Sequence, residues 1–277
     1  MIEKVKEYLF KIWITLSILV LFIAISYVII YIIKNGINSI SLEFIFDNPK
    51  GFPLGSEGGI FPAIVGSLLL MTIACIFSSI LAISTAIYIV FYCESKKIES
   101  LIHMVIQCMA GIPSIILGLF GYTLLVLYMR LGRSALAGGI TLGIMILPYI
   151  QVRIEKILRE VDINIINSSY VLGISKYYMI FKLILPICKE NIISTITLAG
   201  SFAIGASAPI ILTAAVISAP VPNSIHSPVM ALPFHLYILT GEGISLENSY
   251  ATSLVLIMIV LVINIISVIL FIKKKGR

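Results

Sequence analysis

The feature that most constrains this chain is a series of apolar segments, each about as long as a membrane is thick. The first runs from Ile12 to Ile33 with almost no polar residue, and a helix needs about 20 residues to cross a bilayer. Hydrophobic residues make up 60% of the chain and charged residues only 12%. A soluble domain is closer to half apolar and a quarter charged. The sequence therefore predicts an all-α integral membrane protein and excludes a soluble nucleic-acid binder.

Polar breaks divide the chain into six predicted spans, which together form a single transmembrane domain over residues 1–277. The spans are expected at about 12–33, 62–92, 101–128, 136–152, 192–217 and 250–272. The first is expected to be retained, because no small-residue cleavage site follows a short apolar core. Six spans place both termini on the same side of the membrane.

The distribution of basic residues predicts which side that is. Of the 19 Lys and Arg residues, 15 fall in the two termini and in the connections 93–102 and 153–190. Positively charged loops stay on the cytoplasmic side. We therefore expect both termini and the loop 153–190 to be cytoplasmic.

One polar stretch in the second half of the chain keeps helical spacing. Glu160–Pro186 contains too many Asp, Asn, Ser and Lys residues to lie in lipid, yet its apolar residues recur at helical intervals. Gly173 stands between two apolar groups, where a helix end would use the tolerance of glycine for positive φ. Pro186 is expected to close the second group. The stretch is thus predicted to form two short helices joined at a glycine, as a docking element.

No residue pattern indicates catalysis or metal binding. The cysteines have no CxxC spacing and lie in or beside apolar runs, so we expect them to be small core residues. Three histidines without paired ligands do not indicate a metal site. The sequence shows no readable Ser-His-Asp set and no glycine loop for a phosphate. We expect no enzyme activity, no metal and no cofactor on this chain.

The docking stretch resembles the loop of the binding-protein-dependent ABC importer permeases. Their pattern is Glu-Ala-Ala, three residues, Gly, nine residues and then Ile-x-Leu-Pro. The spacing from Gly173 to Pro186 fits it, whereas Asn and Ser replace the Glu and both Ala residues. In that family the loop inserts a short coupling helix into a groove of the ATP-hydrolysing subunit. The ATPase-coupling loop implied by the resemblance contains Asn167, Ser168, Ser169, Gly173, Ser175, Lys176, Tyr177, Tyr178, Leu183, Leu185 and Pro186.

Further segments, in order along the chain, are similar to phosphate permeases of the PstA type. They are GGIFPAIVGSLLL at 58–70, GIPSIILGLFG at 111–121, ASAPIILTAA at 206–215 and PVMALPFHLYIL at 228–239. This resemblance implies a six-helix MetI-like permease fold and half of a pathway for inorganic phosphate. It also implies several partners in a prokaryotic plasma membrane. These are a second permease of the PstC type, two ATP-binding subunits of the PstB type that carry the ATP-Mg, a phosphate-binding protein of the PstS type, and membrane lipid.

The fifth predicted span departs from the family pattern. The family usually has Gly-Glu-Thr-Ala-Pro here with an Arg one turn earlier, whereas this chain has an uncharged 205–209 segment and Phe202 at the Arg position. A family Arg after the fourth span is replaced by Val152, with Arg153 following. Intramembrane charges are costly and normally functional. Either the partner permease supplies them, or Arg153 and Glu155 act instead, or the substrate differs. Arg153 and Glu155 could also form an edge pair that only anchors the fourth span.

Hydroxyl residues and helix breaks in the spans are candidates for the wall of a pathway. A proline break in a membrane survives where protein or water satisfies the freed backbone groups. Hydroxyls and helix N-termini can coordinate an anion without a fixed charge, although Ser and Thr also join helices to one another. The possible pathway residues are Ser67, Pro113, Ser114, Arg153, Glu155, Gly205, Ser207 and Pro209.

Other functions remain open at this stage. The permease could carry another oxyanion, or the chain could be a membrane scaffold that binds an ATPase without transporting. A secondary transporter leaves the docking stretch unexplained. The external segment 218–250 is expected either to help dock the binding protein or to cap the spans.

Overall fold

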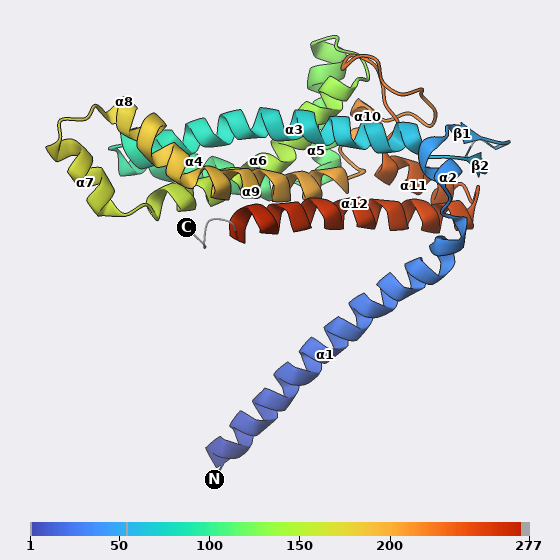
Figure 1. Ribbon diagram of the computed structural model, residues 1–277, viewed down its shortest axis with the longest axis horizontal. Helices are drawn as coiled ribbons and strands as arrows, with labels where there is room; N and C mark the ends of the chain where they lie inside the picture. The colour runs from blue at the N-terminus through green and yellow to red at the C-terminus, as the bar shows by residue number, and fades with distance from the viewer. Residues whose placement is uncertain (1, 54, 273–277) are drawn as a thin grey trace.

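The computed structural model describes residues 2–53 and 55–272, and these are almost entirely helical (Figure 1). The longer helices are α1 (Ile2–Gly36), α3 (Phe61–Ile87), α4 (Lys96–Ala110), α5 (Ser114–Gly121), α6 (Ala135–Arg159), α7 (Ile163–Val171), α9 (Leu185–Ile204), α11 (Leu232–Gly241) and α12 (Leu246–Ile272). The short elements are α2 (Leu42–Phe46), α8 (Lys176–Tyr178), α10 (Ile210–Thr213), a 3-10 turn (Ile37–Ser39) and the paired strands β1 (Pro49–Lys50) and β2 (Glu57–Gly58). Three stretches are π-helical: Tyr88–Tyr92, Tyr122–Tyr128 and Met179–Ile184.

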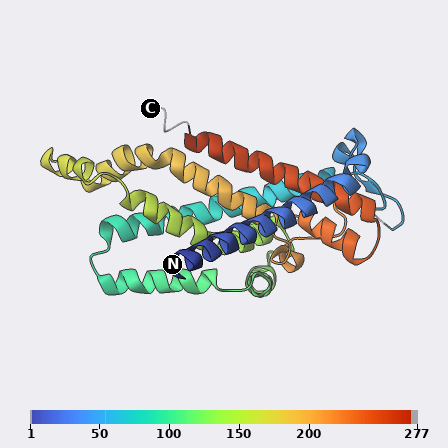
Figure 2. The same ribbon diagram turned by 90° about the horizontal axis from the view of Figure 1, so that it is seen from below.

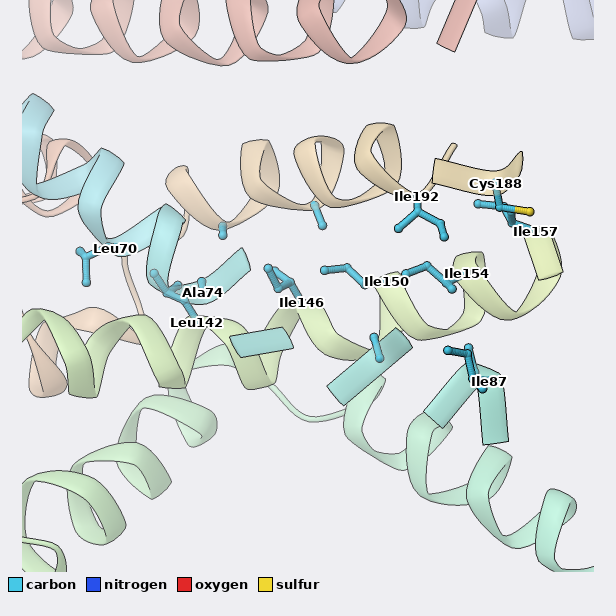
Figure 3. Close-up of a cluster of buried hydrophobic side chains, with 14 of the residues drawn as sticks. Leu70, Ala74, Ile87, Leu142, Ile146, Ile150, Ile154, Ile157, Cys188 and Ile192 are labelled. Carbon is cyan, nitrogen blue, oxygen red and sulfur yellow. The ribbon is translucent and has the colours of Figure 1, made fainter. Parts of the chain in front are cut away.

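Helices α3, α6, α9 and α12 run side by side as a bundle (Figure 1). The pair α3 and α6 packs closely because glycines of α6 leave room for side chains of α3. A Cβ atom added at Gly139 would lie 2.5 Å from Ile73, and one at Gly143 would lie 2.8 Å from Phe77. Such close packing is what holds helices together in lipid, where the hydrophobic effect between them is weak. The buried core that these helices share includes Leu70, Ala74, Leu142, Ile146, Ile150 and Ile154, of which Ile150 and Ile154 lie toward Ile192 of α9 (Figure 3).

The third predicted span is sharply bent. Helices α4 and α5 meet at an angle of 99° across the break at Gly111–Pro113. Pro113 has no N–H to donate and disfavours helical geometry in the residue before it. Its carbonyl accepts hydrogen bonds from the N–H groups of Ile116 and Leu117 and so begins α5. In Figure 2, α4 lies along the bundle, whereas α5 and the π-helical turn after it are seen nearly end-on.

Among the described residues, four helices are long and apolar enough to cross a membrane, and a fifth crossing results if the bent pair α4 and α5 counts as one. The four are Lys6–Ser39, Phe61–Tyr92, Ala135–Arg159 and Leu246–Ile269. The remaining predicted span, 192–217, differs from the prediction. Its helix α9 carries Lys189 and Glu190 and ends at Ile204, because Gly205 and Pro209 interrupt it. The protein is a multi-pass, all-α membrane protein.

The other end of α9 also departs from the prediction. Pro186 was expected to end the second helix of the docking stretch, but the chain stays helical from Lys176 through Pro186 to Ile204. The π-helical stretch Met179–Ile184 lies directly before this proline. The wider π turn breaks the regular bonding pattern at the place where the proline N–H is missing, so the helix continues.

The segment 218–250 is packed against the bundle beside the β1–β2 strands. Within it, α11 contacts α3 and α12, and the side chains of Pro233 and His235 are buried. The Asn248 side chain donates hydrogen bonds to the carbonyls of Gly55 and Ser56, both at 3.0 Å. Pro233 and His235 therefore belong to a cap over the spans.

Candidate functional site

The docking element forms the projecting end of the molecule at the left of Figure 1, where α7 and α8 lie. The Asp162 side chain caps the start of α7, and the Ser175 side chain caps α8. Between them Gly173 has φ +69°, the left-handed conformation that glycine adopts most easily. The prediction of two helices joined at this glycine is confirmed.

The tip of this element exposes large apolar side chains. Val171 is 88% exposed, Leu172 75% and Tyr177 66%. Of the predicted coupling residues, Ser169 is buried and bonds to the Ile165 carbonyl, and three are partly buried: Lys176, Leu183 and Leu185. Those exposed are Asn167, Ser168, Gly173, Ser175, Tyr177, Tyr178 and Pro186. Apolar groups gathered at a projecting tip are typical of a surface that binds another protein.

A first cavity, of about 640 Å³, lies between α5, the break after α9, and α12. It brings together four predicted pathway residues: Ser114, Gly205, Ser207 and Pro209. The wall that the described residues form around it contains hydroxyl and apolar groups but no charged side chain. A close contact shapes this wall, because a Cβ atom at Gly118 of α5 would lie 2.9 Å from the Ala208 carbonyl oxygen.

Two more cavities continue along the same face of α6. One of about 500 Å³ shares Met145 with the first cavity and includes Tyr149 and Arg153. The other, of about 370 Å³, lies between α6 and α9 and includes Tyr149, Arg153 and Lys156. These α6 residues are three or four positions apart, so they lie on one helix face. We call this series of cavities the α6 groove. It is uncharged near Ser207, whereas its other end carries Arg153 and the ion pair of Lys156 with Glu160, which leaves a net positive charge there.

Three predicted pathway residues line none of these cavities. Ser67 is 2% exposed, and its hydroxyl accepts a hydrogen bond from the Leu232 N–H at 2.8 Å, so it joins α3 to α11. One alternative from the sequence was that Glu155 acts together with Arg153, but residues two positions apart on a helix point in different directions. Glu155 lines none of the three cavities of the groove. Pro113 forms the bend directly before Ser114.

Glu155 belongs to a polar cluster between α4 and α6. Its carboxylate lies 3.0 Å from His103 Nε2, and it accepts hydrogen bonds of 2.9 Å from the Gln151 amide and the Arg159 guanidinium. Arg159 also reaches Glu99 at 2.5 Å. The spacing of Gln151, Glu155 and Arg159 marks one face of α6, but nothing in the sequence indicates that α4 lies opposite. Sequence reasoning therefore missed four members of this cluster.

The cluster has the donor atoms of a metal site but not the right charge. Glu99, His103 and Glu155 offer ligand atoms within 4.8 Å of one another. The guanidinium of Arg159 contacts both carboxylates. Its positive charge neutralises them and disfavours a cation at the same place. The arrangement is therefore better suited to linking two helices than to holding a metal.

The structure thus combines a bent span, an open groove and a projecting helical tip in one membrane protein. Residues 78–271 match the family model described as binding-protein-dependent transport system inner membrane component. This match spans most of the chain, and the protein belongs to that family. It is an ABC importer permease, a class of transport subunit that assembles with ATPase and other subunits.

Relatives of this chain share most of its length. It is 29% identical over 266 residues to a probable phosphate transport system permease protein PstA of Methanocaldococcus jannaschii, covering 95% of this chain and 92% of the relative. It is 24% identical over 270 residues to the phosphate transport system permease protein PstA of Pasteurella multocida, covering 96% and 95%. A solved structure of the MetNI methionine ABC transporter, in an inward-facing conformation, matches with a TM-score of 0.63 and 13% identity over 76% of this chain and 94% of that chain. That likeness shows the MetI-like fold.

Proposed function

We propose that this permease forms half of an import pathway for inorganic phosphate, with the α6 groove as its wall. The observation that carries the proposal is the groove itself, which joins an uncharged stretch of hydroxyls to an end of net positive charge within one open face. Phosphate is the preferred substrate because relatives matching nearly the whole chain are named phosphate permeases. A second permease, of the PstC type, would close the open face.

The remaining assignments follow from the same proposal. The exposed tip of α7 and α8 docks on ATP-binding subunits of the PstB type, which bind and hydrolyse ATP-Mg, and a phosphate-binding protein of the PstS type delivers substrate. The excess of Lys and Arg in the two termini and in 153–190 supports a cytoplasmic position for the termini and the docking element. No catalytic residue is assigned to this chain.

The fifth predicted span lacks the Glu and Arg that the family usually has there, and this affects which anion the permease would carry. Since Glu155 is engaged by His103 and Arg159, only Arg153 of the expected pair lines the groove. The partner permease then supplies any further charge, and selectivity depends on the binding protein. Import of a different oxyanion is the second candidate function, and the uncharged 205–209 segment favours it.

Phosphate uptake by reconstituted vesicles tests the proposal. The complex, supplied with ATP and its binding protein, should accumulate phosphate, with arsenate as an effective competitor and sulfate and molybdate as weak ones. Accumulation blocked by sulfate or molybdate would favour the second candidate. A complex that assembles and hydrolyses ATP but accumulates none of these anions would contradict both and favour a scaffold.

A substitution in the groove tests its role directly. A carboxylate about 4 Å from a passing anion repels it by roughly 1 to 4 kcal/mol, depending on the local dielectric. Ser207→Asp should therefore reduce uptake at least about fivefold, whereas the neutral variant Ser207→Asn, of nearly the same size, should reduce it much less. Equal uptake by the two variants would remove Ser207 from the pathway.

A further inference from the structure

The polar cluster between α4 and α6 joins two helices that the chain separates widely. We call Glu99, His103, Gln151, Glu155 and Arg159 the α4–α6 clamp. Arg159, the last residue of α6, donates hydrogen bonds to Glu99 on α4 and to Glu155 on its own helix. Glu155 in turn meets His103 on α4. The clamp thus ties the end of α6 to the first two turns of α4.

The clamp is shielded from water at its centre, whereas the contact of Arg159 with Glu99 is partly exposed. The Gln151 side chain is fully buried, and the Glu155 side chain is only 10% exposed. Hydrogen bonds between ionised groups are shorter and stronger than neutral ones, and removing one partner leaves a partly buried charge unpaired. The end of α6 and the start of α4 are therefore expected to move together.

The clamp lies directly beside the docking element. Only residues 160–162 separate Arg159 from α7. On the far side of α7, the Lys176 ammonium lies 4.7 Å from the centre of the Tyr92 ring, just before α4 begins. Both ends of the α7 segment are thus fastened to the corner where the chain passes from α3 to α4, and a displacement of α7 pulls on that corner.

From this corner a continuous path leads to the groove. Helix α4 is a single 15-residue helix. Beyond its bend, α5 begins at Ser114 and presses Gly118 against Ala208 and Pro209, which line the first cavity. Movement of the start of α4 is therefore transmitted through rigid and closely packed elements to the uncharged wall of the groove. The bend at Gly111–Pro113 is where a change of angle would occur.

We propose that Arg159 is a positioning residue for transport, which passes the movement of the docking element through Glu99 to α4 and on to the wall of the groove. This inference rests on the proposed function, because it assumes that the docking element binds an ATPase. It assigns a role to a residue that lines none of the three cavities of the α6 groove. Coupling free energies between distant sites typically correspond to factors of about 5 to 150.

The test compares Arg159→Gln, Glu99→Gln and the double variant in the reconstituted complex. Each single variant should keep the ATPase subunits bound and hydrolysing ATP, but should import on the order of tenfold fewer phosphate ions per ATP. The double variant should be no worse than either single one, because both remove the same contact. Arg159→Lys, which keeps the charge, should recover part of the loss. The control is Lys11→Gln, which breaks an exposed ion pair within α1 and separates no two elements.

A second readout does not depend on the substrate. In the complex, a cysteine placed by Ser114→Cys should react with a maleimide at different rates with ATP and with ADP, as quantified for that residue by peptide mass spectrometry. Adding Arg159→Gln should remove most of this difference. An unchanged difference, or an unchanged number of ions per ATP in both single variants, overturns the role of Arg159. If the complex carrying Ser114→Cys alone shows the nucleotide effect but the wild-type complex imports no phosphate, the assigned substrate is contradicted and the clamp remains supported.

Discussion

The two ends of the bundle fasten their peripheral elements by different chemistry. At the docking end, the contacts between elements involve charged groups: Arg159 with Glu99, and Lys176 with the ring of Tyr92. At the opposite end, α11 and the β1–β2 strands are held by neutral groups, such as the Ser67 hydroxyl on the Leu232 N–H and the Asn248 amide on two carbonyls. The charged contacts are partly exposed, whereas Ser67 and Leu232 are buried.

This difference indicates which end is built to move. Partly exposed charged contacts are weakened by water and salt and can be exchanged for contacts with another protein. Buried neutral hydrogen bonds are costly to break, because each lost partner leaves a buried polar group unsatisfied. The comparison predicts large effects on stability from changes at the cap and small ones from changes at the docking element.

The largest effect is expected from protonation of His235 in the cap. Burial lowers the pKa of this side chain from its usual 6.5 to about 4. The unfolded chain therefore binds a proton at a higher pH than the folded chain does. The folded protein keeps its full stability above pH 6.5. As the pH falls from 6.5 to about 4, the free energy of unfolding decreases by about 3 kcal/mol.

Unfolding of the detergent-solubilised protein at several pH values measures this effect. His235→Gln should flatten the pH dependence in that window, whereas the same change at the exposed His226 should leave it as in the wild type. If the two variants behave alike, His235 is not the buried group that links the cap to pH.

A smaller loss of stability is expected from Ser67→Ala. The substitution leaves the buried N–H of Leu232 without its acceptor, at a cost of about 2 kcal/mol in the free energy of unfolding. The matched control is Ser84→Ala on the same helix, whose exposed hydroxyl bonds only to a carbonyl of its own helix. Chemical denaturation of both variants should separate them clearly. Equal stability would remove the contrast between the two ends.

At the docking end, Gly173→Ala should destabilise the protein by about 1 kcal/mol, because a side chain at positive φ is strained even though no atom lies within 4 Å of the new Cβ. Gly241→Ala is the control, since that site is equally open but has no positive φ. Gly173→Asn should fall between the two, as Asn tolerates this conformation. Thermal unfolding should rank the three variants in this order, and a neutral Gly173→Ala would count against a fixed turn.

The smallest effect is expected from Lys176→Gln, which removes the contact with Tyr92. A cation over an aromatic ring at an exposed site contributes about 0.5 kcal/mol. The amides of 172–178 should therefore exchange with solvent about twice as fast. Tyr92→Leu should have the same effect, and the double variant should add nothing further. Independent, additive effects would show that the contact does not fasten the element.

Periodicity and turn chemistry predicted much of the secondary structure. Helical segments Phe61–Tyr92 and Leu246–Ile272 cover two of the predicted spans. The turn at Gly173 was predictable because only local geometry decides it. The continuation of the helix through Pro186 was not, because it depends on a π-helical stretch that apolar spacing does not mark. Likewise the end of α9 at Ile204 lies within a run that is apolar on both sides of the break.

Most of the clamp could not be predicted from the sequence, for a different reason. His103 and Glu155 are 52 residues apart, and Glu99 and Arg159 are 60 apart. In the sequence, each of these four residues is indistinguishable from an ordinary polar residue at the edge of a span. Only the packing of α4 against α6 shows that they meet. The groove was partly predictable, since hydroxyls and helix breaks indicated Ser114 and Ser207, but the same reasoning also selected Ser67, which holds the cap.

The first helix of the fold has a consequence for how the protein is made. Within the 18-residue apolar window of α1 no residue is buried by the rest of the chain, and the helix meets the body near its last turns, where Tyr31 contacts Tyr250 and Gly36 is buried (Figure 1). A helix that is apolar on all sides is stable in lipid without tertiary contacts. During synthesis α1 can therefore enter the membrane as an independent anchor, before the helices that form the groove exist. Substitutions that unfold the bundle should leave its insertion intact.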